Sequence, residues 1–113
     1  GGNEQVMLCE RGVRGFEQFT RFTMDVAAIP VIQRLSHLPI IADPSHSTGK
    51  WYLVTPVALA AVAAGAHGLL IEVHPNPDIA KCDGPQSLTF ANFSALMGQV
   101  HAVAGVRKVP AQV

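Results

Sequence analysis

Three short apolar runs recur along the chain, and each of them stops at charged or imidazole side chains. The runs cover residues 5–9, 38–42 and 68–73. Each has the length of one buried strand, and near-continuous apolar strands are typical of parallel sheets that are covered on both faces. The pattern therefore predicts three buried parallel strands.

Helical patterns follow each of these runs. Pro30 indicates that the first helix begins or kinks there, because proline is well tolerated only in a first turn. Thr55 and Pro56 suit the N-cap and first position of the second helix, and Gly65 is its natural C-cap. The third helix carries an apolar stripe on one face. The expected helices cover residues 24–36, 57–64 and 90–103, and the stripe comprises Phe93, Leu96, Met97 and Val100.

The alternation of strand and helix predicts an α/β fold of about three βα units with right-handed crossovers. Three such units are too few for a complete barrel, since a (β/α)8 barrel takes about 250 residues. We therefore expect residues 1–113 to be a single domain fragment, part of a larger barrel, with no regulatory domain in this chain.

Composition narrows the class of protein. The chain is 49% hydrophobic and 14% charged, which favours a globular fold over disorder, and its net charge of zero offers no electrostatic case for nucleic acid or a membrane surface. No apolar run approaches the roughly 18 to 20 residues of a membrane span, and the first residues lack the features of a signal peptide. We expect a cytoplasmic protein with Cys9 and Cys82 as reduced thiols.

Three potential metal ligands lie at or after the ends of predicted strands. His46 follows the second strand, Glu72 closes the third, and Asp83 lies in the loop beyond. Carboxyl ends of parallel strands meet at one edge, and an imidazole with two carboxylates suits manganese, iron or zinc. The alternative is that His46 is a capped loop residue and the two acids are simply solvated.

Two further side chains are candidates for binding a substrate. Arg11 follows the first strand, and its planar fork suits a phosphate or carboxylate, unless it pairs with Glu10 or a neighbouring loop. His74 lies two residues after Glu72, on the same side of an extended strand, where it suits a residue that bonds to a metal ligand or a proton donor.

Several motifs taken together resemble the carboxyl-terminal part of 3-deoxy-D-arabino-heptulosonate 7-phosphate (DAHP) synthase, and above all its type I-beta branch. The resemblance runs from about residue 5 to residue 103, and the motifs are specific because they occur in order at plausible spacings. They read LCERGVR at residues 8–14, DPSHS at 43–47, EVHPNP at 72–77 and DGPQSL at 83–88.

The resemblance implies strands six to eight of a (β/α)8 barrel and a metal-dependent transferase. Its reaction would condense phosphoenolpyruvate with erythrose 4-phosphate, the first step of the shikimate pathway to aromatic amino acids. The family's metal ligands match His46, Glu72 and Asp83, and its phosphoenolpyruvate-phosphate arginine matches Arg11. His46 and Arg11 are thus the expected catalytic residues, the cation being manganese, iron, zinc or cobalt.

The chain departs from the family pattern because the first barrel half is absent. The family's fourth metal ligand, a first-strand cysteine, has no counterpart, and neither Cys9 nor Cys82 is expected to replace it. The lysine-rich substrate loops are also missing. We therefore expect these residues alone to be inactive and poorly stable, and the full-length enzyme to be a dimer or tetramer.

Two rival interpretations remain. The sister 3-deoxy-D-manno-octulosonate 8-phosphate (KDO8P) synthases use arabinose 5-phosphate and share most of these motifs, although VRGFE at residues 13–17 and TRFTMDV at 20–26 resemble the heptulosonate enzymes. The other interpretation is a non-catalytic half-barrel that dimerises or pairs with a partner chain.

Overall fold

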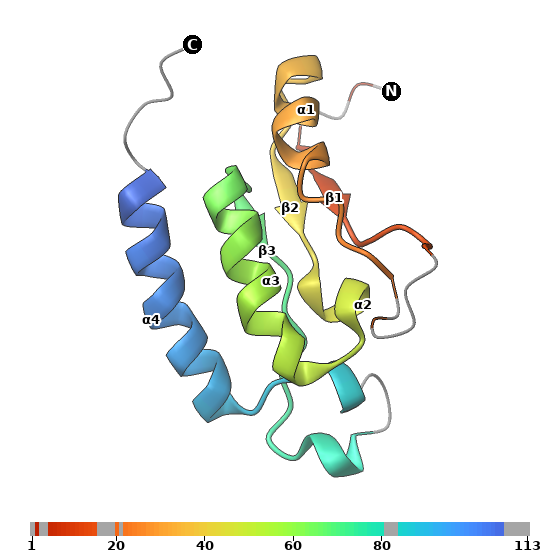
Figure 1. Cartoon of the computed structure of the whole chain (residues 1–113), viewed down its shortest axis with the longest axis vertical. Helices are drawn as coiled ribbons and strands as arrows, with labels where there is room; N and C mark the ends of the chain where they lie inside the picture. Colours follow the sequence, from red (N-terminus) through yellow and green to blue (C-terminus); the bar gives the residue numbers. More distant parts are fainter. Residues whose placement is uncertain (1, 3–4, 16–19, 21, 81–83, 108–113) are drawn as a thin grey trace.

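The computed structural model describes residues 2, 5–15, 20, 22–80 and 84–107, and it contains a parallel sheet of three strands in the order β1-β2-β3. Figure 1 shows these strands with helices between and after them. The predicted fold class, three βα units of a barrel, is confirmed. The elements are β1 (Leu8–Glu10), α1 (Ala28–Leu35), β2 (Ile40–Ala42), α2 (Pro44–Thr48), α3 (Trp51–Ala64), β3 (Gly68–Leu69), the 3-10 turns η1 (Pro77–Ile79) and η2 (Gly84–Gln86), and α4 (Phe90–Arg107).

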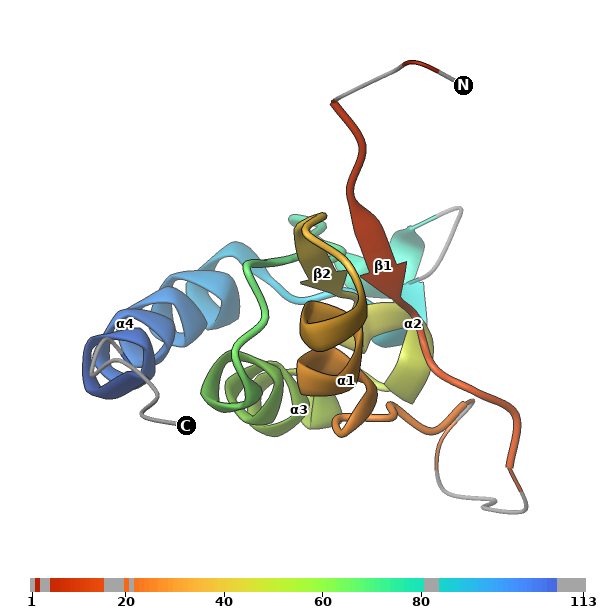
Figure 2. The ribbon, with the colours of Figure 1, turned by 90° about the horizontal axis from the view of Figure 1, so that it is seen from above.

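One face of the sheet is covered by helices. β2 lies in the middle, and side chains that alternate along it point to opposite faces. Ile40 and Ala42 are fully buried in a cluster with Ile29 of α1 and Ala61 of α3. Figure 2 shows α1, α3 and α4 on the same side of the strands. The helical crossovers therefore build the core on this face.

A second apolar cluster joins α3 to α4. Val54 and Ala58 of α3 are fully buried against Leu96 of α4 and against Leu88, which precedes that helix. Other members of the predicted stripe pack around the cluster, as Phe93 and Val100 do. Although α4 has 18 residues, neither it nor any other helix within the described residues is long and apolar enough to cross a membrane.

The other face of the sheet is largely open. Met7 and Cys9 alternate with Leu8 and so share the face of Ile41, which is paired with Cys9. The Met7 side chain is 64% exposed, and Leu70, beyond the end of β3, is 50% exposed. Parallel sheets are normally covered on both faces, so this open apolar face is the arrangement expected of one section of a barrel.

Local signals predicted some helix ends and missed others. Pro30 is the third residue of α1, in its first turn, and Gly65 caps α3 in the left-handed region with φ 106°. The predicted start of α3 at Pro56 was wrong, because the helix begins at Trp51 and contains the proline. Val54 is fully buried in the turn before Pro56, so tertiary packing holds a first turn that the proline disfavours. Helix α4 also continues past the predicted residue 103.

The segment after β1 folds back on α2 through a glycine. Gly12 has φ 103°, a backbone conformation that L side chains rarely adopt. A Cβ atom there would lie 2.9 Å from Cβ of Ser47 and 2.8 Å from Cβ of Phe22. The Phe22 amide donates to the Ser47 carbonyl at 2.7 Å, so the returning segment is bonded to α2. Only glycine permits this close approach.

We expect Gly12→Ala to lower the free energy of unfolding by more than about 2 kcal/mol, because it adds backbone strain to two steric clashes. Gly98→Ala is the matched control, since Gly98 lies in α4 with no heavy atom within 4 Å of an added Cβ. The control should stabilise the helix by about 0.5–1 kcal/mol. Urea unfolding of both variants measures the difference. A midpoint for Gly12→Ala equal to that of the parent protein would refute this packing.

Candidate active site at the carboxyl edge of the sheet

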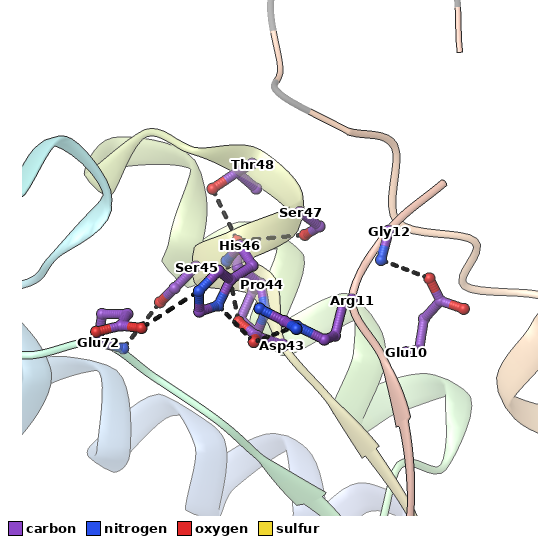
Figure 3. A network of polar contacts seen from close by, with 10 residues as sticks. All are labelled: Glu10, Arg11, Gly12, Asp43, Pro44, Ser45, His46, Ser47, Thr48 and Glu72. Carbon is purple, nitrogen blue, oxygen red and sulfur yellow. Dashed lines mark hydrogen bonds and ion pairs between the residues drawn. The ribbon is translucent and has the colours of Figure 1, made fainter. Parts of the chain in front are cut away.

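The candidate site lies where the carboxyl ends of the three strands meet. Arg11 follows β1, His46 is in α2 immediately after β2, and Glu72 follows β3. Figure 3 shows Arg11 and His46 beside Asp43, and Glu72 beside His46. Nε2 of His46 lies 3.5 Å from Oε1 of Glu72, and Nε of Arg11 lies 3.5 Å from Oδ2 of Asp43. Three of the predicted residues are thus brought together.

Asp43 begins the short helix that carries the imidazole. Its backbone amide donates to the Glu10 carbonyl at 2.8 Å, which fixes the end of β2 against the end of β1. Its side chain is the N-cap of α2 and accepts the backbone N–H of His46 at 2.9 Å, with Pro44 in the first turn. Aspartate followed by proline is a favourable helix start. The strand therefore turns directly into a helix.

The same carboxylate also orients the imidazole ring. His46 is three residues after Asp43, so both side chains lie on one face of the first turn. Nδ1 of His46 lies 2.6 Å from Oδ2 of Asp43. The Asp43 side chain is fully buried, whereas the ring is 20% exposed. Nδ1 is therefore engaged with Asp43, and Nε2 faces Glu72.

Glu72 is held against α2 by its backbone. The Glu72 amide donates to Oγ of Ser45 at 3.0 Å, and its carbonyl accepts the amide of Leu88 at 2.9 Å. Ser45 is fully buried, while the Glu72 carboxylate is 33% exposed. The backbone is thus fixed on both sides, and the carboxylate is left facing the imidazole across the strand ends.

Arg11 pairs across the sheet rather than with its sequence neighbour. Oε1 of Glu10 accepts the amide of Gly12 at 2.7 Å, which closes the turn after β1. Nε of Arg11 is the atom beside Asp43, and the Arg11 side chain is 57% exposed. An ion pair that is this exposed contributes little to stability. The guanidinium is accordingly available to a second anion.

The described residues include two of the three predicted metal ligands. Ligands about 2.0–2.2 Å from one divalent ion lie roughly 3.0–3.5 Å from each other, and the gap from His46 to Glu72 is 3.5 Å. Asp83 lies outside the described residues, and within them no group of three His, Cys, Asp or Glu side chains is arranged to hold an ion. The imidazole and carboxylate fit a transition metal in their chemistry and separation.

The charges of Asp43 and Arg11 both act on the thiol of Cys9. Partial burial raises the pKa of its thiol, and the negative charge of Asp43 raises that pKa further, although Arg11 opposes the effect. That Cys9 does not replace the family's cysteine ligand stays a prediction. Cys82 lies outside the described residues.

One ring nitrogen of His74 bonds within its own loop. Its Nδ1 accepts the amide of Asn76 at 2.9 Å, just beyond the strand end.

Asp43 and Ser45 are the polar residues at the strand edge that the sequence-based prediction did not include. Asp43 had a visible signal, because an aspartate before a proline indicates an N-cap. Ser45 had none, since its partner Glu72 is distant in sequence.

Comparison with known proteins identifies relatives along most of the chain. A family model described as the DAHP synthetase I family matches residues 1–105. A phospho-2-dehydro-3-deoxyheptonate aldolase of Thermotoga maritima is 52% identical over 103 residues, which is 91% of this chain and 30% of the relative. A 2-dehydro-3-deoxyphosphooctonate aldolase of Cronobacter sakazakii is 38% identical over 116 residues, 91% of this chain and 40% of the relative.

A solved structure has the same fold. A truncated form of 3-deoxy-D-arabino-heptulosonate 7-phosphate synthase from Thermotoga maritima superposes with a TM-score of 0.91 at 50% identity. The match covers 94% of this chain and 40% of that chain. This chain thus spans well under half the length of the relatives that it matches.

Two buried serines of α2 test how the strand edge is held. We expect Ser45→Ala to lower the free energy of unfolding by roughly 1–3 kcal/mol, because the Glu72 amide loses its acceptor. Ser47→Ala is the matched control, since the Pro44 carbonyl that accepts from Ser47 at 3.2 Å still accepts from Thr48 at 2.8 Å. Thermal unfolding compares the two. Equal losses would contradict a specific role for the contact between Ser45 and Glu72.

Proposed function

This chain belongs to the DAHP synthetase I family, and on that premise we propose that it supplies part of the active site of a DAHP synthase. The proposed reaction condenses phosphoenolpyruvate with erythrose 4-phosphate and water, giving 3-deoxy-D-arabino-heptulosonate 7-phosphate and phosphate. The observation that supports it most is the 52% identity to the heptonate aldolase, against 38% to the Cronobacter sakazakii octonate enzyme. Arabinose 5-phosphate is therefore the less favoured of the two aldose substrates.

The chain's own residues suggest how it would contribute. Arg11 would bind the phosphate of phosphoenolpyruvate through its terminal nitrogens, because its Nε atom is beside Asp43 and the side chain is 57% exposed. Nε2 of His46 and the carboxylate of Glu72 face each other at 3.5 Å and would hold a divalent cation together with Asp83. Both substrates would thus meet at the carboxyl edge of the sheet.

A divalent cation bound there would act as a Lewis acid that makes the aldehyde of the sugar phosphate more electrophilic. The identity of the cation, whether manganese, iron, zinc or cobalt, depends on availability as well as on ligands. The chain's task would be to orient the imidazole, through its bond to Asp43, and to fix the Glu72 backbone, through its bond to Ser45. His74 remains a weaker candidate for substrate contact.

The open sheet face suggests that the active protein is larger than these residues. Met7 and Leu70 are half-exposed or more on the face that would line a barrel interior. We propose that this face is covered in the complete enzyme and that the enzyme works in the cytoplasm as a dimer or tetramer. By the same reasoning, the 113 residues alone would be inactive.

The test is an assay of the complete protein that carries this chain, with phosphoenolpyruvate, a divalent cation and each aldose phosphate in turn. We expect phosphate release with erythrose 4-phosphate to exceed release with arabinose 5-phosphate, and chelation to abolish it reversibly. His46→Ala should lower the rate by more than the roughly 10–100-fold that outer-shell substitutions cost.

His37→Ala is the matched control, because His37 is an exposed histidine at the opposite end of β2. It should leave the rate unchanged. A higher rate with arabinose 5-phosphate would favour the octulosonate reaction. Full activity of His46→Ala, or no condensation with either aldose, would contradict the proposal.

A further inference from the structure

We propose that Asp43 is a positioning residue, which sets the ring tautomer of His46 for metal binding and at the same time anchors Arg11. The inference rests on the proposed function for its ligands, a divalent cation and a phosphate. Asp43 itself would contact neither the cation nor the phosphate. The inference is drawn from the contacts that its buried carboxylate makes with His46 and Arg11.

The two oxygens of Asp43 have different tasks. One oxygen, Oδ1, accepts the backbone N–H of His46 at 2.9 Å and so caps α2. The other, Oδ2, lies 2.6 Å from Nδ1 of the same residue and 3.5 Å from Nε of Arg11. Both oxygens are therefore engaged, and within the part of the chain that the structure describes their polar contacts are with the two expected catalytic residues.

The contact with Nδ1 determines where the ring hydrogen lies. A carboxylate can only accept, so Nδ1 of His46 must carry the hydrogen when it bonds to Oδ2. In the neutral ring, Nε2 is then the nitrogen without a hydrogen, and its lone pair lies in the ring plane. Nε2 is also the nitrogen that faces Glu72 at 3.5 Å. The tautomer that Asp43 selects is thus the one able to bind a cation beside Glu72.

Burial makes this selection effective. The Asp43 side chain is fully buried, and hydrogen bonds to a charged group gain strength when water is excluded. The contact with Arg11 is weaker, because the guanidinium is largely exposed and its nearest atom is 3.5 Å away. Asp43 should therefore influence cation binding strongly and phosphate binding slightly.

Two substitutions separate positioning from helix capping. Asn and Ser are N-caps about as good as Asp, so Asp43→Asn and Asp43→Ser should both preserve α2. In Asp43→Asn the amide nitrogen can donate to Nδ1, which would move the ring hydrogen to Nε2 and block it. In Asp43→Ser the short side chain leaves Nδ1 without its acceptor. Ser47→Ala, which alters a buried polar side chain of the same helix, is the control.

The experiment titrates the complete apo-protein with Mn²⁺ alone and with phosphoenolpyruvate alone, by calorimetry. We expect both Asp43 variants to bind Mn²⁺ about 10–100-fold more weakly, as outer-shell substitutions do, and phosphoenolpyruvate at most roughly fivefold more weakly. Ser47→Ala should match the parent protein. Folded Asp43 variants that bind Mn²⁺ as tightly as the parent would overturn the proposal.

A second measurement needs no Asp43 variant. In ¹⁵N-histidine-labelled apo-protein, at a pH where the ring is neutral and with His46 assigned by comparison with His46→Gln, Nε2 should give the signal of an unprotonated nitrogen and Nδ1 that of a protonated one. The opposite tautomer would overturn the proposal even if the variants fail to fold. Neither measurement uses turnover, so absence of DAHP synthase activity would refute the proposed function and leave this inference standing.

Discussion

The candidate site depends on the hydrogen bonds of one buried carboxylate, that of Asp43. This residue lies at the point where a strand ends and a helix begins, and it bonds to both the backbone and the ring of His46. Because its own amide is bonded to the end of β1, the position of the imidazole is tied to the sheet. A helix of only five residues can therefore hold a functional side chain in a defined orientation.

Parallel pairing explains why residues distant in sequence meet here. The registers of β1 with β2 and of β2 with β3 bring three strand ends to the same edge. Helices cover one face of the sheet and fix the strands by packing against Ile40 and Ala42 of β2. The candidate site thus lies at the carboxyl edge of the sheet, which is where barrel enzymes place their active sites.

The sequence predicted the features that depend on local pattern. The three strands, the cap at Gly65 and the positions of Arg11 and His46 after strand ends all follow from short stretches of residues. The third strand was predicted too long, because β3 ends at Leu69, before Glu72. The sequence did not predict the early start of α3, because the burial of Val54 overrides the preference of Pro56. The expected helices also did not include α2, although an aspartate before a proline signals a helix start.

The contacts within the site were beyond what a pattern provides. That Arg11 pairs with Asp43 rather than with Glu10, and that Ser45 holds the Glu72 amide, follow from packing between segments far apart in the chain. The family resemblance predicted the metal ligands but not the groups that orient them. Those orienting groups follow only from the way the three strand ends lie side by side in the fold.

Anomalous diffraction from crystals of the complete protein soaked in Mn²⁺ tests this arrangement most directly. We predict one manganese peak bonded to Nε2 of His46 and to the Glu72 carboxylate, with Nδ1 of His46 still on Asp43. A peak bonded to Nδ1, or a manganese site that excludes either residue, would contradict it.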